Sequence, residues 1–88
     1  MIRKHIIFHG SVQGVGFRWR ARNAANFYGC TGWARNDWEG TVTMEIQGTE
    51  EQIDMVLQAI NAGRFIEIDR MDVKTITVDL EERIFRTE

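Results

Sequence analysis

The chain has 88 residues, of which 43% are apolar and 10% aromatic, enough for one small hydrophobic core and a single domain over residues 1–88. It has no apolar run that could span a membrane and no signal-peptide pattern, and its only cysteine, Cys30, excludes an internal disulfide, so we expect a cytoplasmic protein. The net charge of −2 combines a basic part, residues 1–36 with six Lys/Arg and no acid, and an acidic remainder, which argues against a nucleic-acid partner.

The first predicted strand runs from Ile2 to Phe8, and its apolar residues on both faces indicate a central, covered strand. A glycine-rich segment follows, and then a helical pattern that we expect to stop at Gly29. The apolar positions of this first helix are Phe17, Ala21, Ala24, Ala25 and Tyr28.

A second short strand is predicted from Trp33 to Asn36, and a third from Thr41 to Gln47. The third strand alternates cleanly between apolar and polar residues, which predicts one buried face. Asp37 to Gly40 form a short hairpin connection between the two strands.

Thr49 and Gln52 form a capping-box pattern at the start of a second helix, which we expect to end at Gly63. The apolar stripe of this helix is Ile53, Val56, Leu57 and Ile60. A fourth strand is predicted over residues 71–80, with Ile76, Val78 and Leu80 on one face, and Ile84 and Phe85 suggest a short terminal edge.

The order βαββαβ predicts an α/β (α+β) fold, a ferredoxin-like sandwich in which two helices cover one face of a four-stranded antiparallel sheet. In this arrangement the first strand ends where the glycine-rich segment begins, and the first helix begins where that segment ends. Many functions occur on this fold, so the function must be argued from the site.

The segment Gly10-Ser11-Val12-Gln13-Gly14-Val15-Gly16-Phe17-Arg18 could turn several backbone N–H groups toward one point, next to a helix N-terminus and a guanidinium group. This pattern suits a phosphate, although a structural tight turn is an equally open interpretation of the glycines alone. The segment lacks the Gly-Lys-Ser/Thr ending of nucleotide-binding P-loops, the third glycine of the dinucleotide fingerprint and the thiol of cysteine-dependent phosphatases. If backbone amides form a cradle, side-chain identity at Gln13 should matter less than backbone freedom at Gly14 and Gly16.

The other polar residues allow more than one interpretation. Arg18, at the start of the helix, could reach over the cradle or pair with a surface carboxylate. We expect Arg20 and Arg22 to be solvated, and Arg35 to pair with an acid. His5 and His9 share a strand face without a third metal ligand, so we expect structural roles. Trp38 either borders a ligand or is an exposed loop residue.

Two blocks resemble the signatures of the acylphosphatase family: Val12-Gln13-Gly14-Val15-Gly16-Phe17-Arg18, and Gly32 to Val42, which contains Asn36. Their order and spacing extend the resemblance over nearly the whole chain. Ala34 stands where a valine is usual and Glu39 where an Asp is usual. The chain ends in Ile84-Phe85-Arg86-Thr87-Glu88, without the aromatic residue that typically stands last in family members. This difference puts the local stability of the last strand in doubt.

The resemblance implies hydrolysis of acyl phosphates to a carboxylate and inorganic phosphate, without cofactor or metal. It implies that Arg18 and the backbone amides of Val12, Gln13, Gly14 and Val15 bind the phosphoryl group, and that Asn36 orients the attacking water. We expect a small-molecule substrate, no nucleic-acid or membrane partner, and a monomer. The alternatives are a non-catalytic module that binds an anion or small metabolite, and an RNA-binding module, which the helical spacing after the loop and the acidic charge disfavour.

Overall fold

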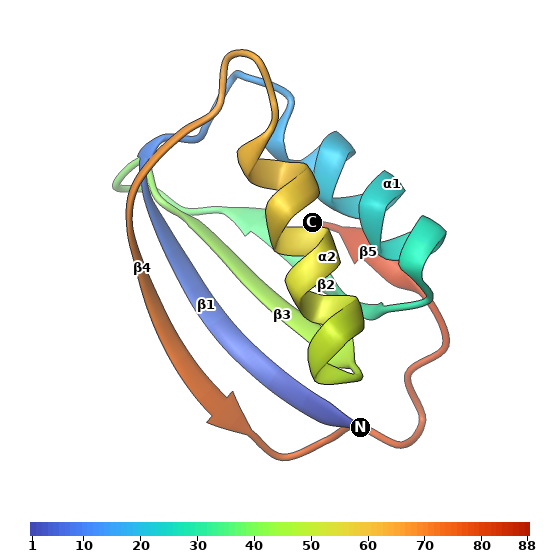
Figure 1. Cartoon of the computed structure of the whole chain (residues 1–88). Coiled ribbons are helices and arrows are strands. Elements are labelled where there is room, and N and C mark those ends of the chain that lie inside the picture. The colour runs from blue at the N-terminus through green and yellow to red at the C-terminus, as the bar shows by residue number, and fades with distance from the viewer.

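Two helices cover one face of a five-stranded sheet in the computed structural model, which describes residues 1–88 (Figure 1). This confirms the predicted fold class and adds one strand to the expected four. No helix is long and apolar enough to cross a membrane. The elements in chain order are β1 (Ile2–Ser11), α1 (Phe17–Tyr28), β2 (Thr31–Asn36), β3 (Val42–Gly48), α2 (Glu50–Asn61), β4 (Glu67–Ile76) and β5 (Phe85–Thr87).

The strands lie in the order β4-β1-β3-β2-β5, so β1 is an interior strand with a partner on each side, as predicted, and β3 is in the middle. All pairs are antiparallel except β2 with β5, which is parallel and closes one edge of the sheet. The predicted bounds of the fourth strand, 71–80, are wrong. β4 ends at Ile76, opposite Arg3, because its antiparallel partner β1 begins only one residue before Arg3. Leu80 lies beyond the end of β4 and is 81% exposed. The strand begins at Glu67 because β1 continues to Ser11.

The helices follow their local signals. Gly29 caps α1 in the left-handed conformation, and the capping box of Thr49 and Gln52 is formed at α2. α2 ends at Asn61, two residues before the predicted stop. The buried residues of the two helices meet the sheet in one apolar core, and the rings of Phe8 and Phe17 are 4.8 Å apart. That contact fixes the end of β1 against the start of α1, on either side of the glycine loop.

The face of the sheet away from the helices is covered in part by residues 77–84. The buried Arg3 guanidinium pairs with Glu82 at 2.8 Å, and Gln47 exchanges two hydrogen bonds with the backbone of Asp79, at 2.8 and 2.9 Å. β3 is therefore buried on both faces, whereas its alternation predicted one buried face. The same contacts lead the chain to β5 at the edge of the sheet.

Candidate active site

The glycine loop, residues 12–16, connects β1 to α1 and is anchored in the core at both ends by the buried side chains of Val12 and Phe17. Gly14 and Gly16 have φ angles of 71° and 81°, a region that residues with a Cβ atom rarely adopt. The N–H groups of residues 13–16 donate to no acceptor in the protein. Because unpaired backbone donors need a partner, these amides are available to an anion.

The N-terminus of α1 is also open. It has no side-chain cap and no acid in its first turn. α2 provides a contrast within the same chain, because Thr49 caps it and Glu50 and Glu51 occupy its first turn. The partial positive charge at the start of α1 is therefore not compensated by the protein itself, which favours an anionic ligand there.

A cavity of about 180 Å³ lies at the junction of the loop and α1, and we call it the cradle cavity. A cavity needs only about 10–15 Å³ of such volume to hold one water, so there is room for a phosphoryl group and a water. The predicted site residues Arg18 and Asn36 both line it, although they come from α1 and β2, but Gln13 and Val15 do not. Its lining residues are Val12, Gly14, Gly16, Phe17, Arg18, Trp19 and Asn36.

Arg18 is held by the end of the chain. Its Nη1 atom donates to the main-chain oxygen of Glu88 at 2.6 Å, and the N–H of Glu88 donates to the carbonyl oxygen of Ala34 in β2 at 2.9 Å. The side-chain carboxylate of Glu88 pairs with Arg86 instead. A guanidinium has five N–H donors, and the others of Arg18 have no protein partner. The sequence did not indicate this anchor.

Asn36 is the last residue of β2, and its side-chain amide makes no hydrogen bond within the protein. An asparagine in a turn often bonds to its own backbone, and Asn36 does not. The carboxylate of the next residue, Asp37, accepts hydrogen bonds from the side chains of Thr43 at 2.6 Å, Thr41 at 2.9 Å and Arg35 at 3.2 Å. Burial alone would raise the pKa of Asp37, but these donors lower it below its ordinary value.

Gln13 joins the glycine loop to the β2–β3 hairpin. Its Nε2 atom donates to the carbonyl oxygens of Asp37 at 2.7 Å and Thr41 at 2.9 Å. Because Asn36 directly precedes Asp37, the two bonds fix the loop relative to Asn36. We expected the Gln13 side chain to matter little, and these contacts give it a positioning role that nothing in the sequence indicated.

The remaining polar candidates lie outside the cradle cavity. Arg35 pairs with Asp37, as expected, whereas Arg20 is half-buried and donates to the carbonyl oxygen of Ala59 at 2.6 Å, so its predicted solvation is wrong. His5 pairs with Glu45 and His9 with Asp72. No group of three His, Cys, Asp or Glu side chains is placed to share a metal ion.

The surroundings of Trp38 and Cys30 show the role of each residue. Trp38 is fully exposed and lines no cavity, so it is an exposed loop residue rather than the border of a site. Cys30 is a buried core residue, and burial raises the pKa of its thiol to about 11, which keeps it protonated.

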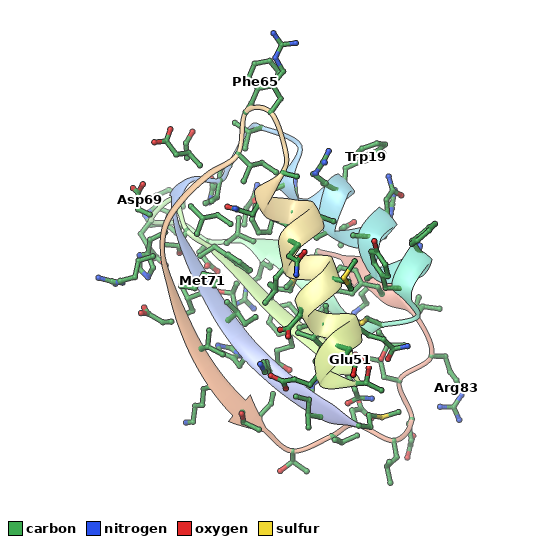
Figure 2. All side chains as sticks on the ribbon, viewed as in Figure 1. Trp19, Glu51, Phe65, Asp69, Met71 and Arg83 are labelled. Atoms are coloured by element: carbon green, nitrogen blue, oxygen red, sulfur yellow. The ribbon has the colours of Figure 1, made fainter.

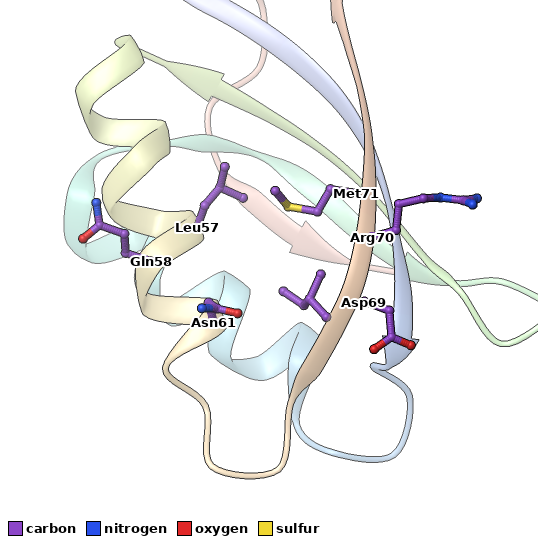
Figure 3. Close-up of a pocket in the computed structure, with 7 residues that line it drawn as sticks. Leu57, Gln58, Asn61, Asp69, Arg70 and Met71 are labelled. Carbon is purple, nitrogen blue, oxygen red and sulfur yellow. The ribbon is translucent and has the colours of Figure 1, made fainter.

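A larger hollow of about 380 Å³ lies between α2 and β4 (Figure 3). Leu57 and Met71 face each other across it, whereas Asp69 and Arg70 lie on the other side of β4. The hollow therefore offers apolar surface without a charged group turned into it. The neutral amides of Gln58 and Asn61 are the donors on its inner side, whereas the cradle cavity has a guanidinium and an open helix N-terminus, so the cradle cavity is the better candidate active site.

Comparison with known proteins found related sequences and a related structure. A family model described as acylphosphatase matches residues 4–87. Acylphosphatase from Geobacillus kaustophilus is 41% identical over 98% of this chain and 93% of the relative, and that from Clostridium perfringens is 39% identical over 99% of both chains. The crystal structure of acylphosphatase from Bacillus subtilis superposes with a TM-score of 0.90 at 27% identity, over 100% of this chain and 99% of that one.

Proposed function

This chain belongs to the acylphosphatase family, and on that premise we propose how it hydrolyses acyl phosphates to a carboxylate and inorganic phosphate. The phosphoryl group binds where the glycine loop meets the cradle cavity, on the backbone amides of Val12, Gln13, Gly14 and Val15 and on the Arg18 guanidinium. The Asn36 amide, which can both donate and accept a hydrogen bond, holds the attacking water. The mechanism needs no metal ion or cofactor.

The reaction is an in-line displacement at phosphorus. The water oxygen forms a bond to phosphorus while the bond between phosphorus and the acyl oxygen breaks, and the electron pair of that bond leaves with the carboxylate. One water proton stays on the attacking oxygen and the other passes to a phosphoryl oxygen or to solvent. Charge on the phosphoryl oxygens is stabilised by donors that are already in place.

The chemistry of the leaving group explains why so few residues suffice. A carboxylic acid has a pKa of about 4, so the departing carboxylate is a stable anion at neutral pH and needs no proton from the protein. Positioning of the water and stabilisation of phosphoryl charge then supply the catalysis. A phosphate ester with an alkoxide leaving group would require a general acid, and none lines the cradle cavity.

One observation carries the proposal: the glycine loop, Arg18 and the unpartnered amide of Asn36 line a single cavity at an uncapped helix N-terminus. We further propose that the protein acts as a single-domain monomer over residues 1–88, in the cytoplasm and without a nucleic-acid partner. The lone reduced cysteine and the acidic composition support these points.

The test is hydrolysis of benzoyl phosphate by the purified protein and its variants. Arg18→Ala should weaken inhibition by inorganic phosphate and lower kcat, whereas Asn36→Ala should chiefly lower kcat. Each change should reduce the rate roughly a hundredfold to a thousandfold, or about 3–4 kcal/mol. Arg64→Ala and Asn26→Ala remove the same side chains from exposed positions and serve as matched controls.

Hydrolysis should also persist in excess EDTA. Complete loss on chelation, restored by a divalent ion, would refute the mechanism. If Asn36→Ala abolished phosphate binding and left turnover intact, the two roles would have to be exchanged. Binding of phosphate by the unmodified protein without any turnover would favour the non-catalytic, anion-binding alternative.

A further inference from the structure

Trp19 and Phe27 expose large aromatic side chains on α1, at 62% and 79% of their surface. They lie eight residues apart, close to two helical turns, so both lie on the same side of the helix. Figure 2 shows Trp19 at the first turn of α1, extending outward from the molecule. An exposed apolar surface of this kind on a small protein commonly marks a binding site.

The two side chains border a groove of about 370 Å³ along α1 and the neighbouring part of α2, which we call the α1 groove. Ala24, Tyr28 and Ala59 complete its apolar lining. The only charged lining residue is Arg20, whose Nε atom is bonded to the Ala59 carbonyl oxygen. The groove therefore suits a neutral, apolar group.

Trp19 also lines the cradle cavity, together with Arg18 and Asn36. The α1 groove and the cradle cavity thus share one residue as a common wall. In an in-line displacement the leaving group departs from the side opposite the attacking water. Asn36, which holds the water in the proposed mechanism, comes from β2, whereas Trp19 comes from α1. Because Trp19 and Asn36 are separate parts of the cavity wall, an acyl group can lie along Trp19 and the α1 groove while the water is held at Asn36.

The charge of α1 supports this direction. Residues 17–28 contain no Asp or Glu, so this helix presents no negative charge to a departing carboxylate. A smaller hollow of about 210 Å³ beside Trp19 is lined by Arg18 and Arg22, which adds positive charge near the carboxylate. The distance along the helix from Trp19 to Phe27 is about 12 Å, enough for an aromatic ring or an alkyl chain.

We propose that the α1 groove, with Trp19 and Phe27, is the binding site for the acyl group, and that the preferred substrates are acyl phosphates with apolar acyl groups larger than acetyl. This proposal rests on the proposed function and names its substrate class. The role that the sequence left open for Trp38 is assigned to Trp19 instead.

The test compares kcat/KM for acetyl, benzoyl and octanoyl phosphate, each corrected for spontaneous hydrolysis. Complete burial of a methylene group raises an equilibrium constant about fourfold, so partial burial in an open groove should give about twofold for each methylene in contact. We expect octanoyl phosphate to exceed acetyl phosphate by at least tenfold, mainly through a lower KM. Trp19→Ala and Phe27→Ala should each reduce that ratio at least fivefold, whereas the matched control Trp38→Ala should leave it unchanged.

A second measurement keeps the proposal separate from the proposed function. Calorimetric titration with octyl phosphate, below its micellar concentration, should show tighter binding than inorganic phosphate, and Phe27→Ala should remove the difference. If no acyl phosphate were hydrolysed, the proposed function would fail while this titration still decided the groove.

Equal kcat/KM for acetyl and octanoyl phosphate, or a preference that both variants retain, would overturn the proposal. So would a dimer that Phe27→Ala dissociates without changing the ratio, because the groove would then bind a second copy of the chain. Circular dichroism should show that the variants fold, because the substituted positions are exposed.

Discussion

Replacing Gln13 by alanine removes both hydrogen bonds between the glycine loop and the β2–β3 hairpin. The two acceptors keep another partner, because the carbonyl of Asp37 still accepts from Gly40 at 3.2 Å and that of Thr41 from Asp37 at 2.9 Å. No buried acceptor is left unpaired, so only the net value of two bonds is lost, about 1–2 kcal/mol in total. If this free energy is needed to hold the loop in the transition state, kcat/KM falls about fivefold to thirtyfold.

The assay is hydrolysis of benzoyl phosphate, with inhibition by inorganic phosphate and urea denaturation measured on the same samples. The loss should appear chiefly in kcat, because the bonds fix the loop relative to Asn36 rather than contact the substrate. Gln13→Glu is the sharper variant, since it keeps the shape but places a carboxylate against two carbonyl oxygens. It should lose more activity than Gln13→Ala. Wild-type kcat/KM in both variants would refute a positioning role for this side chain.

Three further predictions concern the loop, the hairpin and the far face of the sheet. Gly16→Val should lower stability in urea by about 1–3 kcal/mol and weaken phosphate inhibition, because its φ of 81° strains a β-branched residue although an added Cβ would meet no atom within 4 Å. The pKa of Asp37 is lower in the folded protein than in the unfolded chain. The contribution of Asp37 to the free energy of unfolding is therefore complete above the unfolded-state pKa, and it is lost as pH falls through the folded-state pKa. Urea titrations of wild type and Asp37→Asn should therefore differ most above about pH 5 and converge in acid. Arg3→Met should cost about 3–5 kcal/mol of unfolding free energy, since it leaves Glu82 charged and buried, and Arg3→Met with Glu82→Leu should recover most of that loss.

Local signals in the sequence were sufficient for the helices, whereas the choice of Arg18 and Asn36 came from the family resemblance, and the fold brings both to one cavity. Gly29 and the Thr49 capping box act on their immediate neighbours, so the residues themselves carry the information. The predicted bounds of β4 were wrong because the length of a strand depends on its pairing partner. The partner of β4 is β1, which lies at the opposite end of the sequence. No local pattern contains such a fact.

The features of the site that escaped prediction share the same cause. The bonds of Gln13 span 24 and 28 residues, and the bond between Arg18 and Glu88 spans 70. Only the fold distinguishes Trp19, which lines the cradle cavity, from Trp38, which is fully exposed in the hairpin.

The pairing of β1 bears on how the active protein forms. Phe8 pairs with Val42 and Arg3 with Ile76, so the central strand finds partners 34 and 73 residues further along the chain. Contacts at such separations form slowly, because long loops must close before the contacts stabilise the chain. The cradle cavity needs β2 and residue 88 as well as the loop, so a partly folded chain has no complete anion site. On the proposed mechanism, inorganic phosphate, the product of the reaction, binds the folded chain and not the unfolded one, so in excess it should stabilise the protein that released it.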